Sequence, residues 1–351
     1  MSGTGIAVVR VSGTPAERGR AAGVALAEPI HRSLAFYRAF LQRRGVDRGN
    51  LSRLLGPSRS AAERSLPDLV AEVDGLASGA GADPWEVFAV NAFEELEPLL
   101  APVSAGRMER CTAFAVTGPE GTVLAHNEQW YAGDAGNTAV IVAQPDEGPA
   151  FASPTVVTCL PAVGMNAGGL AQGVMSLSAE DDGPGIPRVL ISRLALQAAD
   201  LDDHVRRASI DGRSGGYGYV VAAAGGWARI VETSAGGHGI VEGPGGHTNH
   251  YLDPELAERG DTSAGSTTRL DRLQTLLGER EPRTPRDAMA ILRDHEGEPQ
   301  SICLHPDPAD GDEASSVLFS MVCHLEERRM WVAAGNPCTA PYQEIDIPEV
   351  A

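Results

Sequence analysis

The sequence contains no lysine, so all 28 of its basic residues are arginine. This absence excludes a Schiff-base lysine, a lysine-linked pyridoxal phosphate, a Walker-A lysine and a Ser-Lys dyad. The nucleophiles that remain available for covalent catalysis are cysteine, serine, threonine and the carboxylates.

Cysteine is also scarce, and no C-x-x-C pair occurs. The five cysteines are widely spaced, at Cys111, Cys159, Cys303, Cys323 and Cys338. An odd number at such spacing does not indicate a disulfide framework or a zinc ribbon. We therefore expect no metal and no cofactor, and interpret every cysteine except Cys111 as structural.

Long apolar runs and an excess of positive charge are missing as well. No stretch approaches the ~20 apolar residues that span a bilayer, and no signal peptide is recognisable, so we predict a cytoplasmic protein. The formal charge of −19 disfavours nucleic acid and anionic membranes as partners. With 351 residues and 42% hydrophobic content, the chain can form one large domain or two ordinary ones.

The hydrophobic periodicity changes at Cys111. Residues 15–110 have apolar spacings of three and four, which predict mostly helices. From Cys111 the period becomes two, and the turn composition TGPEG lies between two strand-like segments, which predicts a hairpin. Later strands and helices come in blocks, which favours an α+β fold with antiparallel sheets.

The hairpin places polar residues near the thiol. Since the outer ends of an antiparallel hairpin lie side by side, Asn127 and Gln129 are expected next to Cys111. Considered alone, Cys111 would more often be a buried small hydrophobic residue than a nucleophile.

Further candidate site residues lie next to Cys111 or in glycine-rich loops. Thr112 follows the cysteine, Asn166 lies in GMNAGG, and His247 and Asn249 lie in GHTNHYL. His247 is three residues from His250, but no third metal ligand is at a recognisable spacing. We therefore expect structural hydrogen bonding from the histidines, and no metal site.

Eight segments in the same order resemble the penicillin acyltransferase branch of the N-terminal nucleophile (Ntn) hydrolases. That branch includes isopenicillin N acyltransferase, carcinine hydrolase and the β-alanyl-dopamine hydrolase type. The segments that carry the resemblance are TPAERGRAAG, LPDLVAEVDGLASGAG with NAFEEL, CTAFAV, GMNAGGL, IPRVLISRLALQA, HTNHYL, STTRLDRL and SICLHPDP.

The resemblance implies a four-layer αββα sandwich of two antiparallel sheets with a helical N-terminal segment. It also implies a precursor that cuts itself between Arg110 and Cys111. The helical pro-segment, residues 1–110, and the catalytic core, residues 111–351, would then remain associated as a heterodimer.

The same resemblance implies how the enzyme would work. Cys111 would be the nucleophile, and its freed α-amino group, with a reference pKa of ~7.7–8.0, would be the base. Asn249 would donate to the oxyanion, Asn127 and Gln129 would support catalysis, and Thr112, Asn166 and His247 would contact substrate. The substrate would be a small amide or acyl thioester, with water or an amine as the acyl acceptor.

The chain departs from the family pattern at four places: Gln129, Arg110, Leu304 in SICL, and the missing Ser-Arg pair near Glu313 and Ala314. Gln129 stands where the family usually has an aspartate, unless Glu128 takes that place, and Arg110 stands where glycine is common. Two alternatives stay open: an unprocessed thiol enzyme with His126 or His247 as base for an internal Cys111, and a degenerate Ntn fold that acts as a binding or scaffold protein.

Overall fold

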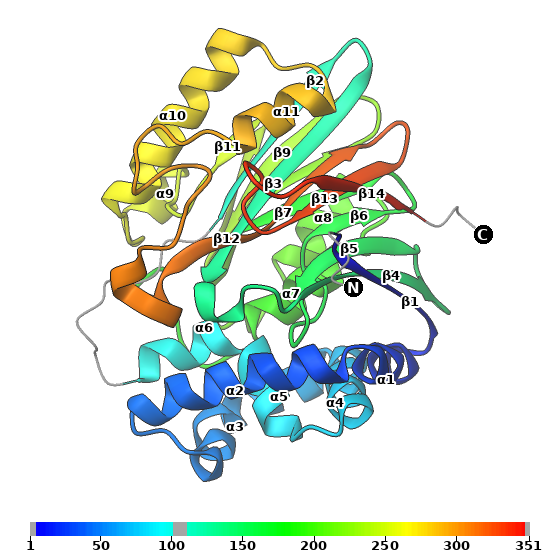
Figure 1. The fold of residues 1–351 in the computed structure, drawn as a ribbon, viewed down its shortest axis with the longest axis vertical. Helices are drawn as coiled ribbons and strands as arrows, with labels where there is room; N and C mark the ends of the chain where they lie inside the picture. The colour runs from blue at the N-terminus through cyan, green and yellow to red at the C-terminus, as the bar shows by residue number, and fades with distance from the viewer. Residues whose placement is uncertain (1–4, 101–110, 348–351) are drawn as a thin grey trace.

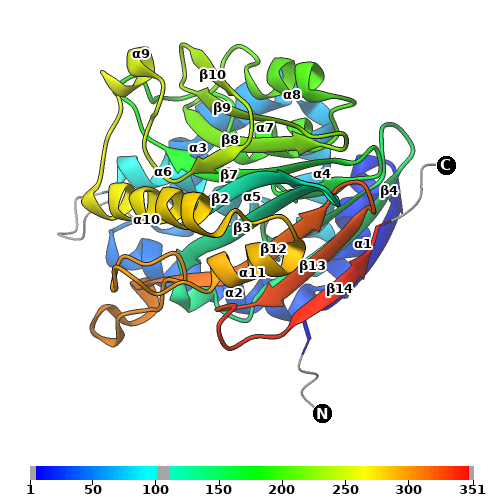
Figure 2. The ribbon, with the colours of Figure 1, turned by 90° about the horizontal axis from the view of Figure 1, so that it is seen from above.

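The computed structural model describes residues 5–100 and 111–347 and has four layers (Figures 1 and 2). Two sheets pack face to face, and helices cover the outer face of each. Within the described residues, no helix is both long and apolar enough to cross a membrane. The predicted αββα architecture is confirmed.

The first sheet has eight strands and is antiparallel except at one edge. In spatial order its strands are β1 (Ala7–Gly13), β4 (Thr138–Pro145), β5 (Phe151–Val156), β6 (Gly164–Asn166), β7 (Leu170–Leu177), β8 (Gly216–Ala223), β9 (Trp227–Thr233) and β10 (His238–Glu242). Edge strand β1 pairs parallel to β4. The N-terminal segment, expected to be mostly helical, thus also supplies a strand to the sheet.

The second sheet has six strands and carries the hairpin that begins at Cys111. In spatial order its strands are β11 (Gly245–His247), β2 (Thr112–Gly118), β3 (Gly121–Tyr131), β12 (Ser315–His324), β13 (Arg329–Ala334) and β14 (Tyr342–Asp346). All of its pairings are antiparallel among the described residues.

Most helices belong to the two outer layers. One layer contains α1 (Pro15–Ala25), α2 (Ala27–Arg43), α3 (Arg48–Ser65), α4 (Pro67–Ala80), α5 (Pro84–Asn91), α6 (Phe93–Leu96), α7 (Arg188–Ala195) and α8 (Leu201–Ala208). On the opposite side, α10 (Ala264–Arg280) and α11 (Pro285–Leu292) cover the six-stranded sheet, and the short α9 (Pro254–Ala257) precedes α10 (Figure 2).

Three hydrophobic cores lie between the four layers and hold them together. In β4, Ala139 and Ile141 pack on the N-terminal helices, whereas Val140 and Val142 pack between the sheets. A smaller core joins α10 and α11 to the second sheet, through residues such as Leu273 and Phe114. Since both faces of each sheet are covered, central strands such as β8 and β12 are buried along nearly their whole length.

Close packing of α1 on α4 buries an ion-pair cluster. A Cβ atom on Gly19 would lie 2.1 Å from a backbone oxygen of α4, and one on Gly75 would lie 2.4 Å from a backbone oxygen of α1. This approach lets Arg18 reach Glu72 at 2.8 Å, and Arg193 of α7 lies 3.2 Å from the same carboxylate. The cluster joins the N-terminal helices to the part of the chain that follows Cys111.

A buried histidine in the fold predicts how stability depends on pH. His204 of α8 contacts Gln172 Oε1 at 2.8 Å, and burial lowers its pKa to about 3. Below pH ~6.5 the unfolded chain binds a proton here that the folded chain does not bind. Stability is therefore lost as the pH falls from ~6.5 towards 3, with about 2 kcal/mol lost by pH 5. Urea titrations at pH 7 and pH 5 measure the loss, and His204→Gln should reduce it. An unchanged pH dependence in this variant would contradict the assignment.

Candidate active site

Cys111 lies at the outer end of the β2–β3 hairpin. The pairing runs from Gly118 opposite Gly121 to Thr112 opposite Asn127, with Pro119 and Glu120 in the turn. Continued by one residue, this register places Cys111 opposite Glu128. The predicted hairpin is confirmed.

The thiol of Cys111 is buried, and its backbone is strained. The residue is 4% exposed, and its Sγ lies 4.0 Å from the Gln129 carbonyl oxygen. Its φ is +80°, in the left-handed region, which costs an L-residue about 1–2 kcal/mol. Strain of this kind is typical of functional sites.

His126 and Glu128 share the side of β3 that faces Cys111. Their side chains are joined by a 2.9 Å contact between His126 Nε2 and Glu128 Oε2. One ligand atom from each of the three residues lies within 4.8 Å of the other two. Burial, followed by the Glu128 charge, raises the pKa of the Cys111 thiol well above its usual range. The thiol of this intact chain is therefore protonated at neutral pH.

Asn127 and Gln129 point the other way, which corrects the expectation that their side chains lie beside Cys111. Asn127 Nδ2 donates to the carbonyl oxygens of Leu292 and Ile302, at 2.9 Å each, and Gln129 Nε2 donates to Ile302 at 3.1 Å. Successive side chains of a strand point to opposite faces, so residues 127 and 129 cannot share the face of residue 128. Of residues 127 and 129, only Gln129 lies next to the thiol, and it does so through its backbone carbonyl oxygen.

Arg269 of α10 connects Cys111 to two of the predicted site residues. Its Nη1 donates to the Cys111 carbonyl oxygen at 2.7 Å and to Thr112 Oγ1 at 3.2 Å. Its Nη2 donates to Asn249 Oδ1 at 3.1 Å. One buried guanidinium therefore brings Cys111, Thr112 and Asn249 together.

The same contact orients the Asn249 amide. Because Oδ1 accepts from Arg269, Nδ2 points towards Ser176 and donates to its carbonyl oxygen at 3.0 Å. Ser176 and Cys111 line the same cavity. The amide that the resemblance assigns to the oxyanion is thus held beside the cavity that contains the thiol.

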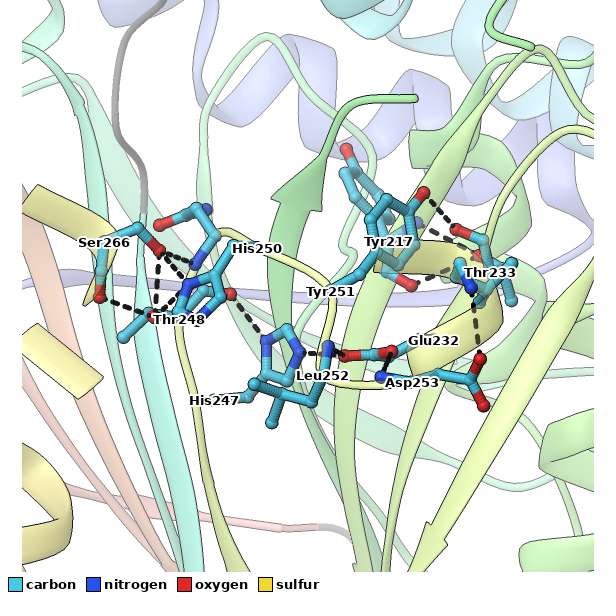
Figure 3. A network of polar contacts seen from close by, with 12 residues as sticks. Tyr217, Glu232, Thr233, His247, Thr248, His250, Tyr251, Leu252, Asp253 and Ser266 are labelled. Atoms are coloured by element: carbon cyan, nitrogen blue, oxygen red, sulfur yellow. Dashed lines mark hydrogen bonds and ion pairs between the residues drawn. The ribbon is translucent and has the colours of Figure 1, made fainter. Parts of the chain in front are cut away.

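His247 supports the loop that carries Asn249. Its Nε2 contacts Glu232 Oε1 at 2.6 Å, and its Nδ1 contacts the Thr248 carbonyl oxygen at 2.5 Å (Figure 3). Glu232 also accepts hydrogen bonds from the backbone N–H groups of Leu252 and Asp253. His247 does not line the cavity beside Cys111, and its contacts hold the loop that carries Asn249.

Asn166 is likewise placed within the scaffold. Its Nδ2 donates to the carbonyl oxygens of Leu196 and Ala198, and its Oδ1 accepts from the N–H groups of Gly168 and Leu170. These bonds attach the turn between β6 and β7 to the end of α7. The structure does not bring Asn166 to Cys111, and the predicted cleavage residue Arg110 lies outside the described residues.

The cavity beside Cys111 is small and mostly apolar. It has a volume of about 80 Å³, and its apolar walls include Val90, Phe93, Val156, Val163, Val174 and Phe319. Two carboxylates, Glu94 and Glu128, also line it. Arg188 lies 3.7 Å from Glu94 and offsets part of that charge. The cavity therefore suits an apolar group that is neutral or carries a positive charge.

Sequence reasoning missed Arg269 and the side of β3 that faces the thiol. Arg269 lies in the segment STTRLDRL, which contributed to the resemblance without any role for its arginine. From the sequence, His126 was considered only as an alternative base, and Glu128 only as an alternative to Gln129. Once the length of the turn is known, the register of the hairpin follows, and this register places His126 and Glu128 on the face of β3 that carries the thiol.

Comparisons with known proteins agree with the sequence resemblance. Residues 116–339 match the family described as Acyl-coenzyme A:6-aminopenicillanic acid acyl-transferase. No curated protein sequence matches the chain significantly.

Two solved structures align at low sequence identity. A mutant conjugated bile acid hydrolase from Clostridium perfringens is 10% identical with a TM-score of 0.43, and the alignment covers 68% of this chain and 97% of that one. The penicillin V acylase from Agrobacterium tumefaciens is 16% identical with a TM-score of 0.40, and the alignment covers 67% of this chain and 86% of that one.

Proposed function

The chain belongs to the Acyl-coenzyme A:6-aminopenicillanic acid acyl-transferase family, and we propose that it is a self-processing enzyme that breaks or makes an amide through an S-acyl intermediate on Cys111. The observation that carries the proposal is the place of Cys111. It combines a buried thiol, a strained backbone and a carbonyl held by Arg269 at the wall of an apolar cavity.

Self-processing begins with attack of the Cys111 thiol on the carbonyl carbon of residue 110. The C–N bond between residues 110 and 111 breaks as a thioester forms, and the nitrogen takes up the thiol proton. Water then hydrolyses the thioester, which regenerates the thiol and leaves a free α-amino group on Cys111. The left-handed φ of Cys111 supports this step, because cleavage releases about 1–2 kcal/mol of backbone strain.

The freed α-amino group then serves as the base in acyl transfer. It accepts the thiol proton as Sγ attacks the substrate carbonyl, and gives that proton to the leaving group. Glu128, opposite Cys111 in the hairpin, holds the resulting ammonium group in the role that the family usually gives to an aspartate. The Asn249 amide donates to the developing oxyanion.

The cavity supports a small substrate with an apolar acyl group. Its volume of about 80 Å³ is small for a substrate pocket, which favours a small acyl group. Glu94 and Glu128 disfavour an anionic acyl group and favour a neutral or amine-bearing one. The acyl donor is then a small amide or acyl thioester, and the acceptor is water or an amine.

The two products of cleavage remain together as a heterodimer. The piece 1–110 supplies strand β1 to the eight-stranded sheet. It also supplies Glu72 to the buried ion pair with Arg193 of the second piece. Separating the pieces would leave charged groups without partners at an apolar interface, which is costly.

A second mechanism is favoured by one observation. His126 lies within 4.8 Å of the thiol and is held by Glu128, an arrangement that suits a Cys–His pair in an uncleaved chain. In this alternative His126 takes the thiol proton, and residues 110 and 111 stay joined.

N-terminal sequencing and intact mass of the purified protein separate the two mechanisms. Self-processing predicts two pieces, one of which begins at Cys111, and predicts that His126→Ala still cleaves. The Cys–His alternative predicts an active chain of full length that His126→Ala inactivates. A full-length chain that is inert towards amides and acyl thioesters would contradict both.

A further inference from the structure

Four potential metal ligands that do not line the Cys111 cavity meet beside the six-stranded sheet. His295 follows α11, Cys303 and His305 lie in the segment that leads to β12, and Cys338 follows β13. One ligand atom from each side chain lies within 4.8 Å of the other three. The cluster thus joins two loops: the connection between α11 and β12, which supplies three ligands, and the connection between β13 and β14, which supplies Cys338.

The distances within the cluster suit a tetrahedral ion. His295 Nε2 lies 3.1 Å from His305 Nε2, which in turn lies 3.3 Å from Cys338 Sγ and 3.9 Å from Cys303 Sγ. Zinc bonds of about 2.3 Å to sulfur and 2.0–2.1 Å to nitrogen give a tetrahedron with edges of about 3.3–3.8 Å. These three distances lie within about 0.4 Å of the tetrahedral edges, and the other three pairs of ligand atoms are at most 4.8 Å apart.

We propose that His295, Cys303, His305 and Cys338 bind one zinc ion. The set of two thiolates and two imidazoles is one that structural zinc sites use. Binding releases one proton from each thiol, and the two thiolates then neutralise the double charge of the ion. Four protein ligands complete the coordination shell, so the ion has a structural role.

The side-chain amide of Asn336 lies next to the Cys303 sulfur. Asn336 Nδ2 lies 3.6 Å from Cys303 Sγ and donates to the Leu304 carbonyl oxygen at 2.7 Å. An amide donor next to a ligating sulfur stabilises the thiolate form. Since Asn336 is only two residues before Cys338, it also holds the two cysteine loops together.

The zinc would support the strand beside the nucleophile. Ile302, adjacent to Cys303, accepts the side-chain hydrogen bonds of Asn127 and Gln129. These two residues flank Glu128 on β3. A metal that fixes residues 302–305 therefore restrains Asn127 and Gln129, on the side of β3 that faces away from the thiol. Removal of the metal would then lower the thermal stability of the active enzyme.

Metal content and cobalt spectroscopy test the proposal on the full chain. We expect about one zinc per chain by elemental mass spectrometry. After chelation, one equivalent of Co²⁺ should give thiolate-to-cobalt absorption and the d–d bands of a tetrahedral site. Cys303→Ser and Cys338→Ser should each weaken zinc binding at least about 100-fold, since loss of a ligand exceeds the ~10–100-fold cost of losing a residue that hydrogen-bonds to a ligand.

Matched controls and one exposed ligand keep the test decisive. Cys323→Ala, a buried thiol outside the cluster, and His238→Asn, an exposed histidine, should bind cobalt like the wild type. His305 is exposed, so His305→Asn should fold and still lose the tetrahedral spectrum. If the reduced wild type binds neither zinc nor Co²⁺ at micromolar concentration, or Cys303 and Cys338 are isolated as a disulfide without metal, the proposal is wrong.

Discussion

Replacement of Cys111 by alanine is expected to leave the chain uncut and to lower kcat at least about 10⁵-fold, the scale seen when an acyl-transfer enzyme loses its nucleophile. Without Sγ, neither attack on the carbonyl of residue 110 nor attack on a substrate can occur. The change removes a single sulfur atom from a buried position, so the loss of volume is small and the fold should remain. Intact mass measures cleavage, and steady-state kinetics on any amide or acyl thioester that the wild type hydrolyses measures activity.

A second buried thiol gives the matched control. Cys323 lies in β12, opposite Leu124 of the same hairpin, and is fully buried. Cys323→Ala should cleave and turn over like the wild type, apart from a modest loss of stability. A Cys111→Ala protein that still splits between residues 110 and 111, or still forms product, would rule out Cys111 as the nucleophile.

The helices and the hairpin could be predicted because they follow from local periodicity, whereas the four layers were implied by the family resemblance. Apolar spacings of three and four before Cys111 predicted helices, and the period of two after it predicted the hairpin, and both are present. Strand β1 escaped prediction because it is short and lies alone before the helices. Its parallel partner β4 is more than 120 residues away in the chain, and no local pattern indicates such a pairing.

The site was harder to predict because it depends on register. The prediction placed Asn127 and Gln129 beside the thiol from the position of the turn alone. A turn of two residues, Pro119 and Glu120, places Glu128 there instead, and a shift of one residue reverses every side chain. Local composition fixes the existence of a hairpin but not the length of its turn.

Contacts between distant segments were beyond local reasoning altogether. Arg269 is 158 residues from Cys111, and Cys338 is 43 residues from His295. Each cysteine and histidine of the cluster occurs in the sequence without a recognisable metal-binding spacing, so the absence of C-x-x-C argued against zinc. Only the packing of α11, β12 and β13 brings the four side chains together.

Arg269→Met is expected to lower kcat about 10²–10³-fold, as loss of an oxyanion donor does, and to slow self-cleavage. The guanidinium holds the Cys111 carbonyl oxygen and the Asn249 Oδ1 atom, so its removal frees the Asn249 amide to rotate away from the cavity. The buried oxygens that lose their donors also cost about 1–3 kcal/mol each in unfolding free energy. Kinetics and urea titration measure the two effects separately. Arg280→Met, at the exposed end of the same helix, should change neither.

A double-mutant cycle distinguishes positioning by Arg269 from general damage to the fold. If Arg269 acts through Asn249, then Arg269→Met combined with Asn249→Ala should lower kcat no further than Asn249→Ala alone. Independent losses that multiply would instead mean that the arginine contributes by another route. Arg269→Lys should restore little activity, because a single ammonium cannot bridge Cys111 and Asn249 as the two nitrogens of the guanidinium do. A lysine variant as active as the wild type would show that charge, and not the two-pronged contact, is what the site needs.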